Sequence, residues 1–251
     1  MDARIDVLGL QIDCVDMEGA VRRAAGFIDS GKHAHLVLAV NPEKVIAARE
    51  EPALADFLRE SDLSIPDGIG VVVAARMLGG RGIRRVASSD LMPELCGLAA
   101  QRDWPIYLYG ASEEVNSRAA DALRARYPGL TVAGRSNGYV EPGDMEHLIA
   151  DINASGAKLL FVGLGSPRQE LWMGQYRRAL TTVRVCQGVG GTLDVIAGRV
   201  KRAPPGWRAV HLEWLYRLIS EPARIKRQRR LPIFVWHCLK AMAKRPRRRH
   251  Q

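Results

Sequence analysis

Polar side chains follow two apolar runs of the chain at points where proline or glycine also occurs. The first segment, 41–44, reads Asn-Pro-Glu-Lys and follows the apolar run 36–40. At the end of a parallel strand, Asn41 can hydrogen-bond a ligand in the crevice that the strand ends form. The same residues suit a helix start, because Asn is a good N-cap and proline fits the first helical position. The local sequence leaves both interpretations open.

A carboxylate stands at the second point, in the segment 65–70 with the sequence Ile-Pro-Asp-Gly-Ile-Gly. Asp67 is a candidate general base, which would remove the proton from an attacking hydroxyl group. An Asp before a Gly is also common as the cap of a helix. Both interpretations fit the local sequence equally well.

The segment 163–170 joins a strand-like run to a helix-like one and reads Gly-Leu-Gly-Ser-Pro-Arg-Gln-Glu. A turn through Gly163 and Gly165 would expose backbone N–H groups at the positive end of the helix, which is a natural site for phosphate. Arg168 and Gln169 add donors that suit a diphosphate. The segment is not a complete G-x-G-x-x-G, so it is only a weak indication of a dinucleotide site.

A second glycine-rich segment, 187–194, reads Gln-Gly-Val-Gly-Gly-Thr-Leu-Asp. Gly190 and Gly191 would let the backbone approach a ligand closely, and Asp194 could accept hydrogen bonds from ribose or sugar hydroxyls. Tight packing of a helix against a strand would explain the glycines equally well.

Metal-binding and nucleophile motifs are missing from the sequence. The six histidines have no H-E-x-x-H or similar spacing, and the chain contains no G-x-S-x-G, P-loop or Asp-x-Asp. The four cysteines lie far apart without a C-x-x-C pair, which argues against a disulfide framework and for a reducing compartment. We therefore predict neither a metal site nor another cofactor.

Predicted strands and helices, which would position these residues, alternate along the first 203 residues. We expect strands at 5–8, 35–40, 63–65, 106–109, 130–133, 158–162 and 183–187. We expect helices at 17–28, 43–49, 69–78, 91–102, 113–126, 145–153 and 168–178. This alternation predicts an α/β fold, with a Rossmann-like, mainly parallel sheet flanked by helices.

A helix-breaking Ala-Pro-Pro-Gly stretch at 203–206 ends this pattern. We predict an α/β catalytic domain over residues 1–203 and a basic helical C-terminal appendage over residues 204–251, with helices at 207–220, 222–230 and 231–243. The last of these would be about 20 Å long, too short to cross a bilayer core of about 30 Å. The start of the chain lacks a basic region followed by a long apolar stretch, so we expect no signal peptide and a cytoplasmic protein.

Charge divides the chain in the same way. Of the 37 basic residues, 16 lie from Arg199 onward, with only two of the 27 acidic residues, Glu213 and Glu221. The appendage should therefore meet an anionic partner. Its arginines lie among aromatic and aliphatic residues, which indicates an amphipathic segment on an anionic membrane. A solvated face of a docked helix is the alternative; nucleic acid is less favoured, because no helix-turn-helix or RNA-recognition motif is present.

Four segments, taken in order, resemble the WecG/TagA/CpsF family of bacterial glycosyltransferases. They are 66–70, 163–170, 190–204 and 212–217 (Leu-Glu-Trp-Leu-Tyr-Arg), and Glu221-Pro222 follows. The resemblance spans roughly residues 5–230. It implies a metal-independent, inverting transfer of a sugar from a UDP-sugar to a polyprenyl-diphosphate-linked saccharide at the inner face of the cell membrane. Exopolysaccharide, capsule or a related surface glycan would be the product.

The resemblance also implies roles for single residues. Asp67 would be the general base on the acceptor hydroxyl. Three residues would position the sugar and the diphosphate: Asn41, Arg85 and Gln169. Tyr139 and Asp194 would contact uridine. Three arginines of the appendage would lie near the lipid diphosphate: Arg217, Arg224 and Arg227.

The residues themselves agree with this reaction class. An inverting displacement needs one base and no nucleophile. The leaving diphosphate needs positive charge, which arginines can supply where no Asp-x-Asp holds a metal, and Arg85 and Arg168 are the best candidates in the first 203 residues.

Two departures from the family pattern fall where substrate should bind. The family usually has Thr two positions before the Asn, where this chain has Ala39, and its Arg-Val-Thr-Gly segment reads Arg-Val-Ala-Ser at 85–88. The sugar specificity, including the N-acetylmannosamine donors known in the family, therefore does not transfer directly. Two rival functions are a soluble nucleotide-sugar-modifying enzyme and a nucleic-acid-binding protein that uses the basic tail. A homo-oligomer is left open.

Overall fold

The computed structural model describes residues 3–210, 212–220 and 228–243. Its strands are β1 (Arg4–Val7), β2 (Leu10–Asp13), β3 (His35–Val40), β4 (Leu63–Pro66), β5 (Ile106–Gly110), β6 (Val132–Ser136), β7 (Leu159–Gly163) and β8 (Val185–Gly188). Its longer helices in the first 180 residues are α1 (Met17–Ser30), α2 (Pro42–Glu50), α3 (Pro52–Arg59), α4 (Ile69–Met77), α5 (Ser88–Gln101), α6 (Glu113–Arg126), α7 (Met145–Ala154) and α8 (Arg168–Tyr176). The helices after β8 are α9 (Thr192–Ile196), α10 (Pro205–Ala209), α11 (Glu213–Ser220) and α13 (Arg230–Ala243). Short 3-10 turns at Pro142–Asp144 and Arg177–Ala179 complete the assignment.

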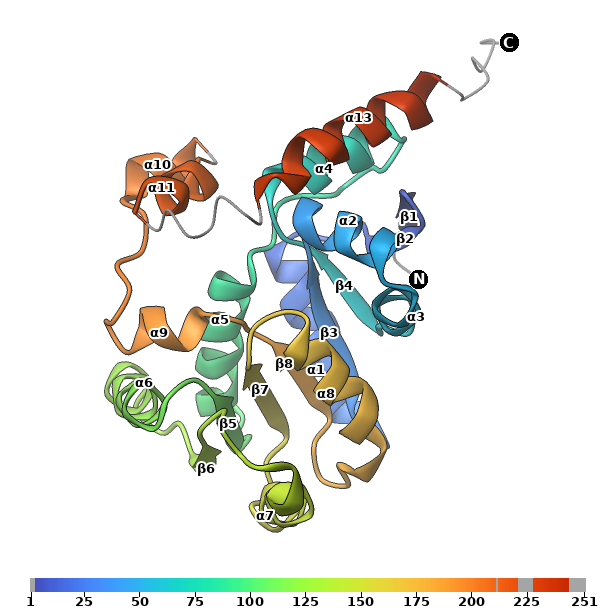
Figure 1. The fold of residues 1–251 in the computed structure, drawn as a ribbon. Helices are drawn as coiled ribbons and strands as arrows, with labels where there is room; N and C mark the ends of the chain where they lie inside the picture. Colours follow the sequence, from blue (N-terminus) through green and yellow to red (C-terminus); the bar gives the residue numbers. More distant parts are fainter. Residues whose placement is uncertain (1–2, 211, 221–227, 244–251) are drawn as a thin grey trace.

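Six parallel strands form the central sheet in the order β4-β3-β8-β7-β5-β6. This arrangement, drawn in Figure 1, confirms the predicted α/β fold with a parallel sheet flanked by helices. The chain steps outward in opposite directions from β3 to β4 and from β5 to β6, so the sheet has the reversal of strand order at which α/β proteins bind ligands.

Alternating side chains divide the interior into two layers, one on each face of the sheet. In β3, Leu36, Leu38 and Val40 pack into one layer, and Val37 and Ala39 pack into the other. The first layer is completed by α2, α3, α4, α7 and α8, and the second by α1, α5, α6 and α9. Strands covered on both faces are apolar along their whole length, as in β5 and β7, which explains why they are visible in the sequence.

The N-terminal strand does not join the central sheet. β1 pairs antiparallel with β2, and the turn between them has positive φ at Leu8 (57°) and Gly9 (96°). A two-residue turn of this kind favours a tight hairpin. The sequence analysis missed β2 because the turn lies within the uninterrupted apolar stretch Val7-Leu8-Gly9-Leu10, and it missed α3, which begins at Pro52 directly after α2.

Helices of the C-terminal region differ in part from those expected. The helix predicted at 207–220 is wrong as a single element, because α10 ends at Ala209 and α11 begins at Glu213. The helix predicted at 222–230 lies largely outside the described residues. α13 agrees with the third helix; it packs against α2 and buries Phe234 and Cys238 in the same layer. A Cβ atom added to Gly70 of α4 would lie 3.8 Å from a ring carbon of Phe234, so α4 also meets α13, next to which Figure 1 draws it. Within the described ranges, none of the helices combines the length and the apolar character needed to span a bilayer.

Candidate active site

The carboxyl ends of four neighbouring strands bring together the segments singled out in the sequence. Because the strands are parallel and adjacent, the residues after β4, β3, β8 and β7 follow one another along the same edge of the sheet. Asp67 follows β4 and Asn41 follows β3. The glycine-rich turns follow β8 and β7. We call this edge the carboxyl edge.

Asp67 lies half-buried between the end of β4 and the start of α5. Its backbone N–H donates to Val40 O at 2.9 Å, which ties it to the end of β3. Its Oδ2 accepts a long hydrogen bond of 3.4 Å from Ser88 N, in the first turn of α5. The cap interpretation for α4 is wrong, since Gly68 is the N-cap residue and no side chain caps that helix. The carboxylate is therefore held near the positive end of α5.

Asn41 lies beside this position. A Cβ atom added to Gly68 would be 3.8 Å from Asn41 Cβ, so the two loops are in contact. Asn41 is the N-cap of α2, and its Oδ1 accepts from Lys44 N at 2.8 Å. The cap interpretation is confirmed, and any contact with a ligand would fall to the other end of the amide, Nδ2.

The two glycine turns contain glycines of two different kinds. Gly163 is required by packing, because a Cβ atom there would lie 2.9 Å from Leu193 Cδ1 and 3.1 Å from Gly190 O. Gly165 and Gly190 have positive φ, and a Cβ atom on either would meet nothing within 4 Å. Packing therefore accounts for Gly163, for which only a ligand-binding turn was expected, while Gly165 and Gly190 border open space that a ligand can enter.

The helix start after the first glycine turn is only partly available to an anion. Gln169 N donates to Gly165 O at 2.9 Å, so one N–H group of the expected cradle is already used. Arg168 is exposed, and its Nη2 donates to Leu164 O at 2.9 Å, which leaves further guanidinium donors. Gly191 is exposed and precedes α9.

Gln169 is buried rather than presented to solvent, with 4% of its surface exposed. Its Oε1 accepts from Gly190 N at 3.0 Å, and its Nε2 donates to Glu170 Oε1 at 3.0 Å. Glu170 is fully buried and pairs with Lys44 Nζ at 2.8 Å. Burial opposes the ionisation of Glu170, but the Lys44 ammonium and the hydrogen bonds from Lys44 and Gln169 hold the pKa of this carboxyl below its usual value.

The residues expected to contact uridine lie on separate elements. Tyr139 follows β6 and is 73% exposed; it borders an open pocket of about 410 Å³ whose lining includes Asn137 and His147. Its neighbour Gly138 packs against Leu164 of the first glycine turn. Asp194 is in α9, where its Oδ1 lies 3.5 Å from Arg199 Nη1. Their contact with uridine stays a prediction.

Arg85 is held by a residue that the sequence analysis did not select. Its Nη2 donates to Glu213 Oε2 at 3.0 Å, and the Glu213 side chain is 8% exposed. Arg202 Nε lies 3.9 Å from Glu213 Oε1, and Arg202 Nη2 donates to Asp90 Oδ1 in the first turn of α5. Glu213 lies in segment 212–217, which the resemblance includes. α11 is thereby fixed beside the loop that leads from Arg85 to Ser88.

The structure does not describe the side chains of the three arginines that the resemblance places near the lipid diphosphate. Arg217 lies in α11, but its side chain, together with Arg224 and Arg227, falls outside the described residues. Large apolar side chains of α11 and α13 are exposed, among them Ile219 (65%) and Trp236 (56%).

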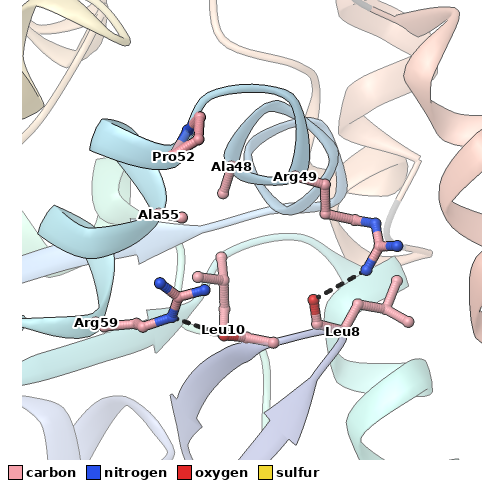
Figure 2. A pocket seen from close by; sticks show the side chains of 8 residues that line it. Leu8, Leu10, Ala48, Arg49, Pro52, Ala55 and Arg59 are labelled. Carbon is pink, nitrogen blue, oxygen red and sulfur yellow. Dashed lines mark hydrogen bonds between the residues drawn. The ribbon is translucent and has the colours of Figure 1, made fainter.

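A larger pocket lies away from the carboxyl edge. It measures about 440 Å³ and lies between the β1–β2 hairpin and the α2–α3 pair (Figure 2). Arg49 Nη1 donates to Leu8 O at 3.5 Å, and Arg59 Nε donates to Gly9 O at 3.4 Å, as Figure 2 shows. The residues predicted for the site do not line this pocket, so we do not assign it to the reaction.

Two histidines that are not in a sequence motif meet a carboxylate at the other end of β3. His33, His35 and Asp62 each place a ligand atom within 4.8 Å of the others. No spacing motif in the sequence indicates this group, because Asp62 comes from the residues before β4, far from the two histidines along the chain. Phe27 stacks on His35 at 4.2 Å, and Arg177 Nη2 lies 3.9 Å from Asp62 Oδ2. This group lies at the amino ends of the strands, opposite the candidate site.

Comparison with known proteins shows the family to which the chain belongs. The sequence pattern of the Glycosyl transferase WecG/TagA/CpsF family matches residues 5–248. The chain belongs to this family. It is 36% identical over 233 residues to an N-acetylglucosaminyldiphosphoundecaprenol N-acetyl-beta-D-mannosaminyltransferase of Bacillus spizizenii, covering 92% of this chain and 89% of that protein. The protein is therefore a glycosyltransferase, which confirms the family and the activity class expected from the four segments.

Proposed function

We propose that this glycosyltransferase moves a sugar from a UDP-sugar to a polyprenyl-diphosphate-linked saccharide, with inversion and without a metal ion. The observation that carries the proposal is the position of Asp67, half-buried at the carboxyl edge between Asn41 and the start of α5. The Bacillus relative is named for transfer of N-acetylmannosamine to an N-acetylglucosaminyl-diphosphate lipid. This makes UDP-N-acetylmannosamine the first donor to test.

In the proposed reaction the acceptor hydroxyl attacks the anomeric carbon of the donor, on the face opposite the UDP group. Asp67 accepts the proton of that hydroxyl as the new bond forms. The bond from the anomeric carbon to UDP breaks at the same time, and UDP leaves with its electron pair. Arg85, Arg168 and the N–H groups near Gly165 and Gly190 would stabilise the negative charge that develops on the diphosphate.

The acceptor lipid would bring the enzyme to an anionic membrane surface. Support comes from the exposed apolar side chains of α11 and α13, such as Ile219 and Trp236, and from the concentration of basic residues after Arg199. We expect charge reversal of Arg224 and Arg227 to weaken binding to anionic vesicles, and high salt to have the same effect. Cosedimentation that is insensitive to salt would instead indicate insertion of the apolar side chains alone.

The function is tested by UDP release from the purified protein. Each UDP-sugar of a panel is offered with and without a polyprenyl-diphosphate-linked saccharide, in the presence and absence of EDTA. The proposal predicts release only when the acceptor is present, at the same rate with EDTA. Release without acceptor would indicate a hydrolase, and a rate abolished by EDTA and restored by a divalent metal would contradict the metal-free mechanism.

A further inference from the structure

One buried ion pair of this molecule has no part in the reaction described above. Lys44 Nζ and Glu170 Oε1 are 2.8 Å apart, and the side chains are 7% and 0% exposed. The residues are 126 positions apart in sequence. Removing two charges from water costs so much that such a pair is rarely a gain in stability over two apolar residues. Its retention therefore calls for another explanation.

The contacts of this pair supply that explanation, because they lead to the loops that follow β3, β7 and β8 at the carboxyl edge. Lys44 Nζ donates a second hydrogen bond of 2.6 Å to Ala39 O, two residues before Asn41. The backbone N–H of Lys44 donates to Asn41 Oδ1 at 2.8 Å. Lys44 thus holds the end of β3 and the side chain of Asn41 from two sides.

Glu170 orients the loops after β7 and β8 through its hydrogen bond with Gln169. An ionised carboxylate only accepts hydrogen bonds, so Gln169 must turn its Nε2 toward Glu170 Oε1. This leaves Gln169 Oε1 facing Gly190 N, which donates to it at 3.0 Å. The charge on Glu170 therefore fixes the orientation of the Gln169 amide, and the amide fixes the glycine turn after β8.

We propose that Lys44 and Glu170 are positioning residues, which hold the three loops after β3, β7 and β8 in the register that binds the diphosphate of a nucleotide. Neither residue touches the reacting atoms. The inference rests on the proposed function in naming the ligand, but the contacts that it explains do not depend on that function.

The discriminating variant replaces both charges at once. Glu170→Gln alone leaves a buried ammonium without its partner and can simply destabilise the fold. The double variant Lys44→Met/Glu170→Met removes both charges and keeps most of the volume, so we expect its melting temperature to stay near that of the wild type. UDP affinity, measured by calorimetry, should nevertheless fall about tenfold, because the turn at Gly190 is no longer held.

Hydrogen exchange provides a readout that requires no ligand. In the wild type, the Gly190 amide is bonded to Gln169 Oε1, and we expect it to exchange several-fold faster in the double variant. A matched control is Arg23→Met, which removes one arginine from the buried Asp13 at the amino end of β4. It should lower the melting temperature without changing UDP affinity or exchange at Gly190.

The proposal is overturned if the double variant binds UDP as the wild type does and protects Gly190 equally well. A lowered melting temperature together with wild-type affinity would show that the pair serves the fold alone. A wild-type protein that does not bind UDP would contradict the proposed function, whereas faster exchange at Gly190 in the double variant would still support the network.

Discussion

Two buried carboxylates of this protein, Asp13 of β2 and Glu170 of α8, lie beside opposite ends of the central sheet. Asp13 Oδ1 accepts from Arg4 Nε at 3.0 Å and from Arg23 Nη1 at 2.6 Å, and its Oδ2 accepts from Ser64 N at 2.7 Å. These partners come from β1, α1 and β4, so the contacts of Asp13 fasten the hairpin and a helix to the sheet. The contacts of Glu170 lead to loops that border open space.

Burial of a charge alone therefore does not distinguish a structural role from a functional one. The two carboxylates are equally inaccessible, at 0% exposure. What their hydrogen-bond partners contact separates them. The partners of Asp13 tie one regular element to another, whereas the partners of Glu170, Lys44 and Gln169, lie in the first turns of α2 and α8 and bond on to Asn41 and Gly190 in the loops of the site. Substitutions at the two ends of the sheet should therefore differ in whether they change turnover or stability.

The largest effect is expected at the carboxyl edge. Asp67→Asn should lower turnover about 10³-fold, because it removes the general base. UDP affinity should change little, since the base acts on the acceptor and not on the donor. Steady-state kinetics and calorimetry with the same preparation measure both. Near-normal turnover of this variant would show that the proton goes elsewhere.

At the amino ends of the strands, a substitution should change stability rather than turnover. Asp13→Ala leaves Arg4 and Arg23 without their shared acceptor and should lower the free energy of unfolding by about 3 kcal/mol. Chemical denaturation measures this change, and the folded variant should turn over at the wild-type rate. A loss of turnover without loss of stability would remove the contrast between the two ends.

An intermediate effect is expected where α11 meets the site. Glu213→Gln weakens the contact that orients Arg85 and should lower kcat/KM about tenfold, equivalent to about 1.4 kcal/mol. The matched control is Glu50→Gln, which breaks an exposed ion pair between α2 and Arg230 of α13. Exposed ion pairs contribute little to stability, so the Glu50→Gln control should keep its activity. Equal losses in both variants would argue for a general effect of the C-terminal region.

The smallest effect concerns pH. The pKa of Glu170 is lower in the folded protein than its usual value of 4.5, so its carboxylate contributes stability that is fully present above that value and declines as the pH falls below it. The difference in unfolding free energy between the wild type and Glu170→Gln should therefore shrink between pH 6 and pH 3.5. A constant difference over this range would show that the pKa of Glu170 is the same in the folded and the unfolded protein, and a wild type that gains stability relative to the variant as the pH falls would show that Glu170 is neutral when folded.

Much of the fold could be predicted from the sequence because most strands of the sheet are buried on both faces. Runs such as 36–40 and 159–162 are apolar throughout, and most of the helices between the strands could be placed from their pattern. The hairpin strand β2 was missed because Leu8 and Gly9 turn the chain within a continuous apolar run, a conformation that only the backbone dihedral angles reveal.

The candidate site was predictable in its segments but not in its contacts. Asn41, Asp67 and the two glycine turns could be found because each follows an apolar run. Lys44, Glu170 and Glu213 lay inside the same quoted segments, but their roles depend on partners more than 100 positions away. A single sequence gives no signal that identifies contacts between such distant residues.

The central claim, that the nucleotide binds at the carboxyl edge, is tested most directly by a crystal structure of the protein with UDP. We predict diphosphate oxygens within hydrogen-bond distance of backbone N–H groups in the turns around Gly165 and Gly190. UDP bound instead in the pocket of Figure 2, against Arg49 and Arg59, would contradict the account.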